Sequence, residues 1–197
     1  MKYRILLASL LAALGATGAF AQTTTATTVQ RDVNQQTRIE NGLKDGSLTT
    51  QEAGRLEREQ SQVDRLQAKD LKNGKLSLKE RAQLRRAQDK ASHDIRAAET
   101  NGVKGNPQSL SSERMQADVQ RDVNQEKRIE QGVQSGSLTN HEAGSLERGQ
   151  AGVDRKEAQA AHNGHINKHE QAAIQGKQNR QSEVLFEKKH NDKLRKG

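Results

Sequence analysis

The chain has 197 residues, carries a formal net charge of +8 and contains no cysteine. The lack of cysteine excludes a disulfide framework and a lipid-attachment cysteine, so helix packing alone has to stabilise the fold. Aromatic residues make up only 2% of the chain, which argues against the aromatic platform on which single-stranded nucleic acids stack.

Residues 1–21 have the features of an export signal. Lys2 and Arg4 precede an apolar run, and the small residues Ala19 and Ala21 frame an expected cleavage site. The apolar run is short for a membrane span, and no later segment approaches the roughly 20 apolar residues that a spanning helix needs. We therefore expect a periplasmic or secreted mature protein without a transmembrane segment.

The remaining chain is a tandem duplication with an offset of 90 residues. The 32 residues from Val29 align without a gap with those from Val119, and 22 of the 32 positions are identical. A repeat of this kind is the plan on which the domain is built. The expected divisions are the signal peptide at 1–21, a first helical unit at 22–101, a linker at 102–116, a second unit at 117–191 and a basic tail at 192–197.

Within each unit the composition and spacing predict helices. Strong helix formers dominate, and the alternation typical of strands is missing. In the first unit, apolar positions predict helices around Val29–Leu43, from about Thr50 to Leu71, and around Leu84–Ala98. The expected fold class is therefore all-α, with two tandem units of three antiparallel helices joined by short glycine turns. Because the apolar stripes are narrow, docking of the two units or homodimerisation is expected to supply further burial.

Four glycine-centred turns resemble the second half of a calcium-binding EF-hand loop. The glycines are followed by an aliphatic residue and, at the twelfth loop position, by a glutamate. In EF-hands that glutamate chelates calcium together with acids at the first positions, but here those acids are missing except for Asp45 in the loop that ends at Glu52. The same residues fit helix junctions, in which glycine ends one helix and a Ser/Thr-x-x-Glu box starts the next. We favour the junction and keep weak calcium binding by Asp45 and Glu52 as the alternative.

Histidine is concentrated in the second unit. His162, His165 and His169 lie within eight residues, with Glu170 beside them, and imidazoles at such spacings can bind a transition metal. The first unit has lysines at the matching positions, so an exposed polar surface is the favoured interpretation.

No residue pattern indicates catalysis. The sequence lacks a cysteine nucleophile, a G-x-S-x-G elbow and an H-E-x-x-H helix. The many acidic residues alternate with Lys and Arg, so we expect them to be solvated on helix surfaces. The repeated pairs Arg31–Asp32 and Arg121–Asp122 belong to a block that could be a docking surface or could form a salt bridge within each unit that orients its first helix. The salt bridge is the favoured interpretation. We predict no enzyme and no cofactor.

The signal peptide and the repeat of the type "RIENGLKDGSLTTQEAGRLE" resemble those of uncharacterised small exported helical repeat proteins of Gram-negative bacteria, with degenerate EF-hand-like turns. The resemblance implies export and a helical repeat, and it supplies no activity. The expected function is a non-enzymatic binding or structural protein of the cell envelope. Two alternatives stay open: a divalent-cation-binding protein that uses the turns or the histidines, and a basic protein that adheres to an anionic envelope polymer. The partner is accordingly expected to be a protein or such a polymer.

Overall fold

The computed structural model describes residues 16–191, with side chains from Thr24 onward. Its helices are α1 (Ala16–Asp45), α2 (Thr50–Asp70), the 3₁₀ turn η1 (Leu71–Asn73), α3 (Leu78–Thr100), α4 (Leu110–Ser135), α5 (Asn140–Ala160), the 3₁₀ turn η2 (Ala161–Asn163) and α6 (Lys168–Lys189). The all-α prediction is confirmed for this part of the chain. No helix within it is both long and apolar enough to cross a membrane.

Two predicted segments fall partly or wholly beyond the described residues. The expected signal peptide lies outside them up to residue 15, and its last six residues form the start of α1. The basic tail at 192–197 lies outside them entirely. The segment 102–116 is a linker only in its first part, because α4 begins at Leu110.

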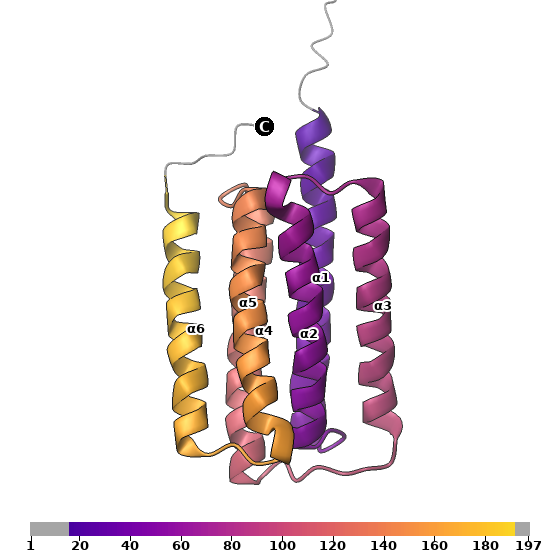
Figure 1. The fold of residues 1–197 in the computed structure, drawn as a ribbon, viewed down its shortest axis with the longest axis vertical. Coiled ribbons are helices and arrows are strands. Elements are labelled where there is room, and N and C mark those ends of the chain that lie inside the picture. The colour runs from indigo at the N-terminus through magenta and orange to yellow at the C-terminus, as the bar shows by residue number, and fades with distance from the viewer. Residues whose placement is uncertain (1–15, 192–197) are drawn as a thin grey trace, which may run out of the picture.

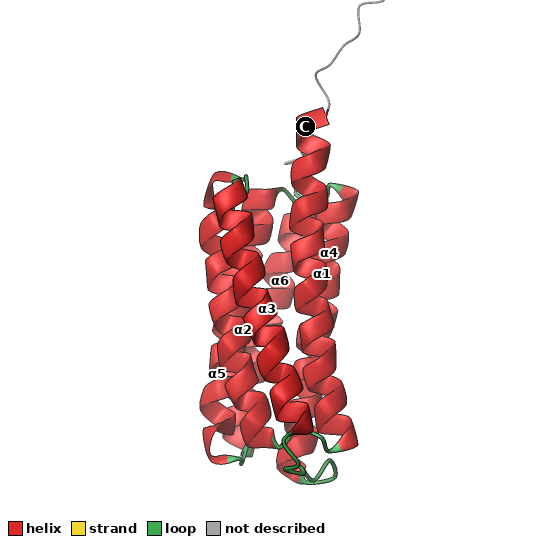
Figure 2. Cartoon of the chain, turned by 90° about the vertical axis from the view of Figure 1, so that its right-hand side faces the viewer, coloured by secondary structure: helices red, strands yellow, loops and turns green. Residues whose placement is uncertain are grey.

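The six α-helices run parallel and antiparallel to one long axis and form a bundle (Figure 1). In the view of Figure 1, α2 and α5 lie in front of α1 and α4, and α3 and α6 stand on the two outer sides. Figure 2, turned by 90°, separates the α2/α5 pair on one side from the α1/α4 pair on the other. The interior of the molecule is therefore the space enclosed by these four central helices.

The two repeats are not separate three-helix units. The most extensive helix contacts are between repeats, where α2 packs on α5 and α1 packs on α4. Within each repeat the third helix, α3 or α6, covers the groove between the other two. The narrow apolar stripes explain this arrangement, because three such helices alone bury little apolar surface, whereas docking one repeat on the other encloses a common interior. The expected docking of the units is confirmed, and it joins them into one bundle.

Glycines allow α2 and α5 to approach closely. A Cβ atom on Gly54 of α2 would lie 2.5 Å from the Cβ of Ala161, and one on Gly144 of α5 would lie 2.7 Å from the Cβ of Leu71. Real Cβ atoms do not approach other atoms so closely, so the two positions require glycine at the observed helix separation. Gly54 and Gly144 are 90 residues apart and occupy equivalent positions in the two repeats, as do Leu71 and Ala161. The same close contact therefore occurs twice between the repeats.

The glycine turns are helix junctions, as the sequence indicates. Gly46, Gly74, Gly136 and Gly164 all adopt positive φ angles between 75° and 81°, the left-handed conformation that ends helices. At each turn a Thr, Ser or Asn caps the next helix and a glutamate three residues later completes the capping box. The helix boundaries at these turns are thus fixed locally, and α1 extends beyond the other helices at the upper end of the bundle (Figure 1).

Apolar side chains fill the two ends of the bundle. One cluster, drawn from the lower end in Figure 1, comprises Ile39, Leu43, Leu48, Ala53, Leu56, Ile95, Met115, Val119, Val153, Ala160, Ala161, Ile166 and Ile174. Another, from the upper end, comprises Ala26, Val29, Leu71, Ile129, Val133, Leu138, Ala143, Leu146 and Leu185. A small third cluster of Val63, Leu84 and Ala91 joins α2 to α3. Between the two end clusters the interior is polar.

Candidate metal centre

Buried carboxylates occupy the middle of the bundle. Nine of the described acidic residues are at most 3% exposed: Asp32, Glu57, Asp64, Asp118, Asp122, Glu126, Glu147, Asp154 and Glu157. We refer to them as the carboxylate layer. The expectation that the acids are solvated on helix surfaces is wrong for these nine. They face inward because docking of the two repeats converts a polar helix face into an interior.

Helical spacing aligns these residues along the inner faces of α2 and α5. On α2 the buried polar positions include Glu57, Gln60, Asp64 and Gln67, at intervals of three, four and three residues. On α5 the equivalent series is Glu147, Gln150, Asp154 and Glu157. Residues three and four apart share one face of a helix. The seam that usually carries apolar side chains in a bundle therefore carries carboxylates and amides here.

The carboxylate layer contains two clusters of close oxygen atoms. In the first, which we name cluster A, oxygens of Asp32, Asp64 and Glu147 lie within 4.8 Å of one another. In the second, cluster B, the same holds for oxygens of Glu57 and two α5 residues, Asp154 and Glu157. Each cluster combines side chains from both repeats.

Each cluster also has a fourth carboxylate close by. The charges of the cluster A residues Glu147, Asp64 and Asp32 raise the pKa of Glu126 of α4 more than that of Asp122 does, which places Glu126 next to cluster A. Asp122 of α4 interacts with Glu157, which places it at cluster B.

Glutamine side-chain amides donate hydrogen bonds to several of these carboxylates, to one oxygen of each. The Nε2 atom of Gln88 donates to Asp32 Oδ1 at 2.7 Å in cluster A. In cluster B, Gln178 Nε2 donates to Asp122 Oδ1 at 3.0 Å and to Glu157 Oε1 at 3.2 Å. Gln36 Nε2 donates to Glu57 Oε2 at 2.9 Å. These bonds orient the carboxylates, as hydrogen bonds to ligand groups do around metal ions.

The opposite oxygens have no hydrogen-bond partner. Unpartnered and buried are Asp32 Oδ2, Glu57 Oε1, Asp122 Oδ2, Glu126 Oε2, Glu157 Oε2 and both carboxylate oxygens of Asp118, Glu147 and Asp154. No Lys, Arg or His is among the buried residues in the described part of the chain, so no basic side chain neutralises the layer. Burial of charges without a partner is costly, and a protein retains such groups when they bind a proton or a cation.

Burial and mutual repulsion raise the pKa values throughout the layer. Desolvation raises the pKa of Asp64 to about 7, and the neighbouring carboxyl group of Asp154 opposes the shift. Desolvation raises the pKa of Asp122 to about 6. The pKa of Glu147 is raised well above its usual range by burial and then by the charges of Asp64 and Asp32. The carboxyl groups of the layer thus keep their protons to a higher pH than exposed acids do, unless a bound cation replaces the protons.

The donor set fits a hard multivalent cation. The available ligands are carboxylate and amide oxygens, which suit Ca²⁺, Mn²⁺ and ions of similar character rather than soft metals. Two oxygens 4.8 Å apart can share an ion at about 2.4 Å, within the range of Ca²⁺–oxygen bonds. Helical bundles commonly hold metal ions by carboxylates that project inward from facing helices.

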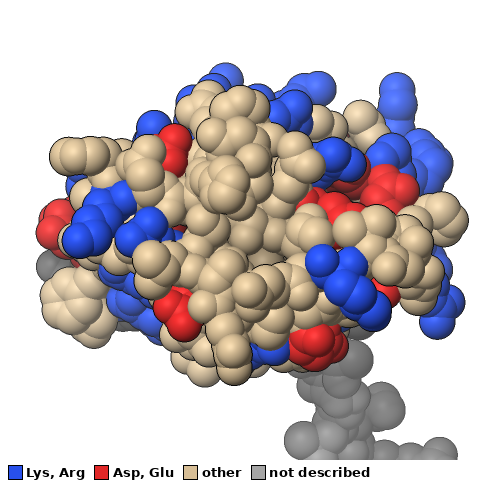
Figure 3. Space-filling model, turned by 90° about the horizontal axis from the view of Figure 1, so that it is seen from below, with Lys and Arg blue, Asp and Glu red and all other residues tan. Residues whose placement is uncertain are grey.

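The sequence-predicted calcium ligands do not join the carboxylate layer. Glu52 caps α2, where its Oε2 accepts a hydrogen bond from the backbone N–H of Thr49 at 2.9 Å, and its Oε1 accepts one from Asn101 at 2.6 Å. Asp45 Oδ1 accepts from the N–H of Ser47 at 2.8 Å. Figure 3 looks onto this end of the bundle and shows acidic and basic residues dispersed around an uncharged centre. The turn is therefore held as a helix junction.

The histidine cluster stays on the surface. His162, His165 and His169 are all exposed, and His162 Nδ1 lies 3.2 Å from the carbonyl oxygen of Gln159. Glu170 completes the capping box of α6 with Asn167. Among the described residues, the sets of three metal-binding side chains within 4.8 Å lie in clusters A and B, and none includes these four residues.

The repeated Arg–Asp pairs divide between the surface and the interior. Arg31 forms an ion pair with Asp89 of α3, and Arg121 NH2 donates to Asn179 Oδ1 of α6 at 2.7 Å. Of the two expected salt bridges within a repeat, the one in the first repeat forms, with its acid on α3. In the second repeat the neutral Asn179 stands in place of that acid, so Arg121 makes a hydrogen bond and no ion pair with it. The adjacent Asp32 and Asp122 face the other way, into the layer.

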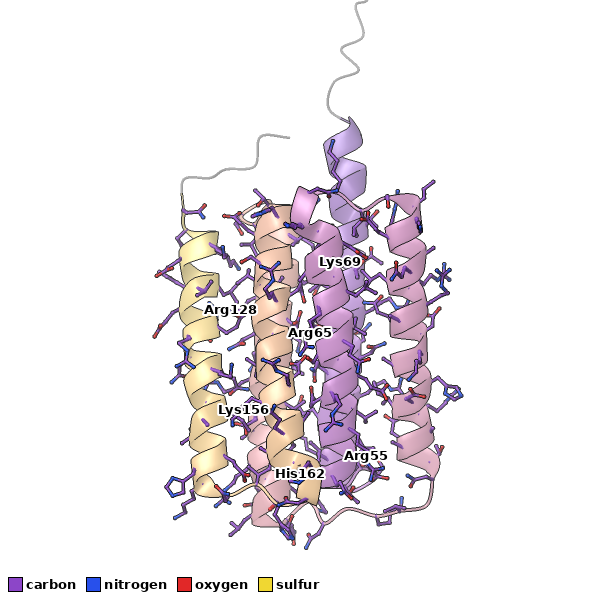
Figure 4. All side chains as sticks on the ribbon, in the orientation of Figure 1. Arg55, Arg65, Lys69, Arg128, Lys156 and His162 are labelled. Carbon is purple, nitrogen blue, oxygen red and sulfur yellow. The ribbon has the colours of Figure 1, made fainter. Side chains whose placement is uncertain are left out.

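The outer face of α2 and α5 is basic. It carries Arg55, Arg58, Arg65 and Lys69 on α2, and Arg148, Arg155 and Lys156 on α5. None of the seven forms an ion pair within 4.0 Å with a described acidic residue. Figure 4 labels Arg55, Arg65 and Lys69 along α2, one of the two helices at the front of the view. A groove of about 330 Å³ on this face is lined by Arg58, Ser61, Gln62, Arg65, Arg155, Ala158 and Gln159. We name the seven basic residues on the two helices, Arg55, Arg58, Arg65, Lys69, Arg148, Arg155 and Lys156, the basic face.

Comparison with protein-family models, with curated proteins and with solved structures finds no match to this chain. The site is therefore defined by its own geometry.

Proposed function

We propose that this protein is a non-enzymatic, exported binding protein that holds hard multivalent cations on its carboxylate layer. The observation that carries the proposal is the set of unpartnered, buried carboxylate oxygens in clusters A and B, with no buried basic side chain beside them. A cation would supply the missing charge and the missing ligand contacts together. This replaces the turns and the histidines as the location of a cation site.

The charge of the clusters favours ions with a high positive charge. Each cluster gathers four carboxylates, so a trivalent ion leaves less uncompensated charge than one divalent ion. We therefore expect Tb³⁺, which resembles Ca²⁺ in size and ligand preference, to bind more tightly than Ca²⁺. Mg²⁺ is expected to bind weakly, because it keeps its water molecules and demands strict octahedral geometry.

Equilibrium dialysis of the mature chain, residues 22–197, against Ca²⁺, Mn²⁺ and Tb³⁺ near neutral pH tests the proposal. The expected result is retention of at least one ion per chain that is lost in the double variant Asp32→Asn/Asp122→Asn. The matched control Asp89→Asn changes an exposed aspartate and should leave retention unchanged. Absence of retention in the unmodified protein, or equal retention in the double variant, would refute the proposal.

The histidines provide a second control. A triple variant with alanine at His162, His165 and His169 is expected to retain Ca²⁺ and Tb³⁺ undiminished, because these side chains lie outside the layer. Loss of retention in this variant would place the site on the surface instead.

A second candidate function is favoured by the basic face. Seven basic side chains on one surface that form no ion pair within 4.0 Å with a described acid attract polyanions. A phosphate-bearing envelope polymer such as lipopolysaccharide is the partner that suits an exported protein. Replacing Arg58, Arg65 and Arg155 with glutamine should lower the salt concentration at which the protein elutes from immobilised lipopolysaccharide. The control replaces Lys72, Lys75 and Lys79, which are exposed elsewhere. Equal elution of the two triple variants would refute this function.

A further inference from the structure

We propose that the carboxylate layer comprises two adjacent cation sites, each completed by both repeats, and that cluster B fills before cluster A. The inference rests on the proposed function and adds the number of sites, their composition and their order.

The 90-residue offset relates the two clusters. Asp32 and Asp64 of cluster A correspond to Asp122 and Asp154 of cluster B. Glu147, which reaches cluster A from the second repeat, corresponds to Glu57, which reaches cluster B from the first. The two repeats therefore exchange one glutamate each, and neither site can form from a single repeat.

Two Gln/Glu differences between the repeats compensate each other. At one pair of equivalent positions the first repeat has Gln36 and the second has Glu126, which lies at cluster A. At another, the first repeat has Gln67 and the second has Glu157, which lies in cluster B. Each difference adds one carboxylate to a different cluster. Clusters A and B consequently hold four carboxylates each, although the repeats differ at both positions.

Both clusters present buried ligand atoms that nothing else engages. In cluster A, both oxygens of Glu147 lack a hydrogen-bond partner, and so does Asp32 Oδ2. In cluster B the same is true of both oxygens of Asp154 and of Glu57 Oε1. Glu57, Glu147 and Asp154 are fully buried. Each of the two clusters therefore has buried, unpartnered oxygens that a cation would satisfy.

Asp118 distinguishes the two sites. It lies one helical turn before Asp122 on α4, is fully buried, and has no partner for either oxygen. The equivalent residue of the first repeat is Thr28, a neutral side chain. Cluster B thus has an additional carboxylate next to it that cluster A lacks. Because a nearby negative charge in a poorly hydrated interior strengthens cation binding, cluster B is the tighter site.

Calorimetric titration of the full mature protein with Tb³⁺ tests the inference. The unmodified protein should bind two ions per chain in two steps whose affinities differ by about tenfold or more, as expected for one additional nearby charge. Asp122→Asn should remove the tighter step and Asp32→Asn the weaker one. Asp118→Thr, which installs the residue of the other repeat, should bring the two affinities together by weakening the tighter step.

Three outcomes would overturn the inference while leaving the proposed function intact. They are binding of one ion per chain, loss of all binding in either single Asn variant, and an unchanged affinity ratio in Asp118→Thr. Far-ultraviolet circular dichroism of each variant establishes that it is folded. The reciprocal variant Thr28→Asp provides an independent arm, because it should bring the affinities together by strengthening the weaker step. Failure of the unmodified protein to bind Tb³⁺ at all would instead refute the proposed function.

Discussion

Replacing Asp64 with asparagine should stabilise the cation-free protein and destabilise the cation-loaded one. Asp64 belongs to cluster A and neighbours Asp154 of cluster B, and burial raises its pKa from the ordinary 3.8 to about 7. Above about pH 7 the side chain is ionised in both the folded and the unfolded state. The free energy of burying its charge then destabilises the folded state in full. Asparagine keeps nearly the same shape without the charge.

The magnitude follows from the shift. About three pKa units at 1.36 kcal/mol each correspond to roughly 4 kcal/mol, which is an upper bound because the asparagine amide also needs hydrogen-bond partners. The sign depends on pH. Since the folded-state pKa of Asp64 is raised, its contribution to the free energy of unfolding is fully present below about pH 4. That contribution is lost as the pH rises towards 7. The advantage of Asp64→Asn over the unmodified protein should therefore be absent near pH 4 and largest at about pH 8.

Urea unfolding in the presence of a chelator, followed by circular dichroism at about pH 5 and pH 8, measures this difference. Addition of Tb³⁺ at the higher pH should reverse the order of stability, because an ion that binds only the folded state stabilises it and Asp64→Asn removes a ligand. Asp89→Asn, which breaks a surface ion pair with Arg31, should cost less than about 1 kcal/mol. A chelator-treated Asp64→Asn protein that is less stable at about pH 8 than the unmodified one would show that the layer is not a repulsive cluster.

Further predictions concern the packing, the caps and the dependence of one repeat on the other. Gly144→Ala should destabilise the protein by about 1–3 kcal/mol, because its Cβ would collide with Leu71. Gly176→Ala on α6 should stabilise it by about 0.5–1 kcal/mol, because the added Cβ would meet only Arg180 Nη1 at 3.9 Å, an ordinary contact. Equal effects of the two variants in thermal unfolding would contradict the close approach of α2 and α5. Thr139→Ala should cost about 1 kcal/mol by removing the cap of α5 while leaving Tb³⁺ stoichiometry unchanged, and altered stoichiometry would implicate the turn in binding. The separate repeats 22–101 and 102–191 should each have little helix at low concentration and gain it when mixed, since the main helix contacts are between repeats; full helicity of either repeat alone at all concentrations would refute this.

The helices and their ends could be predicted from the sequence because both are encoded locally. Glycine followed three residues later by a Ser/Thr/Asn cap and then by a glutamate sets each junction, and the predicted second helix agrees with α2 to within one residue. The pairing of α1 with α4 and of α2 with α5 could not be predicted in the same way, because the apolar stripes fit contacts within a repeat as well as between repeats.

The carboxylate layer escaped prediction because burial of an acid depends on the neighbouring helix. Asp64 follows Val63, and Glu57 follows Leu56, so each acid is one position from an apolar residue and falls at the border of the helix stripe. In a single helix that border faces water, and the alternation with arginine supports a solvated surface. The signal that could have identified the layer is the spacing of Glu57, Asp64 and their amide neighbours at intervals of three and four, with the arginines at the intervening positions.

The number of water molecules that coordinate a bound Tb³⁺ ion tests most directly whether the carboxylate layer holds the ion. The luminescence lifetime of directly excited Tb³⁺, compared in H₂O and D₂O, counts the water molecules that coordinate the ion. If the carboxylate layer holds the ion, most of its water should be replaced by protein oxygens, and this shielded signal should disappear in Asp32→Asn/Asp122→Asn. An ion that keeps most of its water, or a shielded signal that survives in the double variant, would contradict the account.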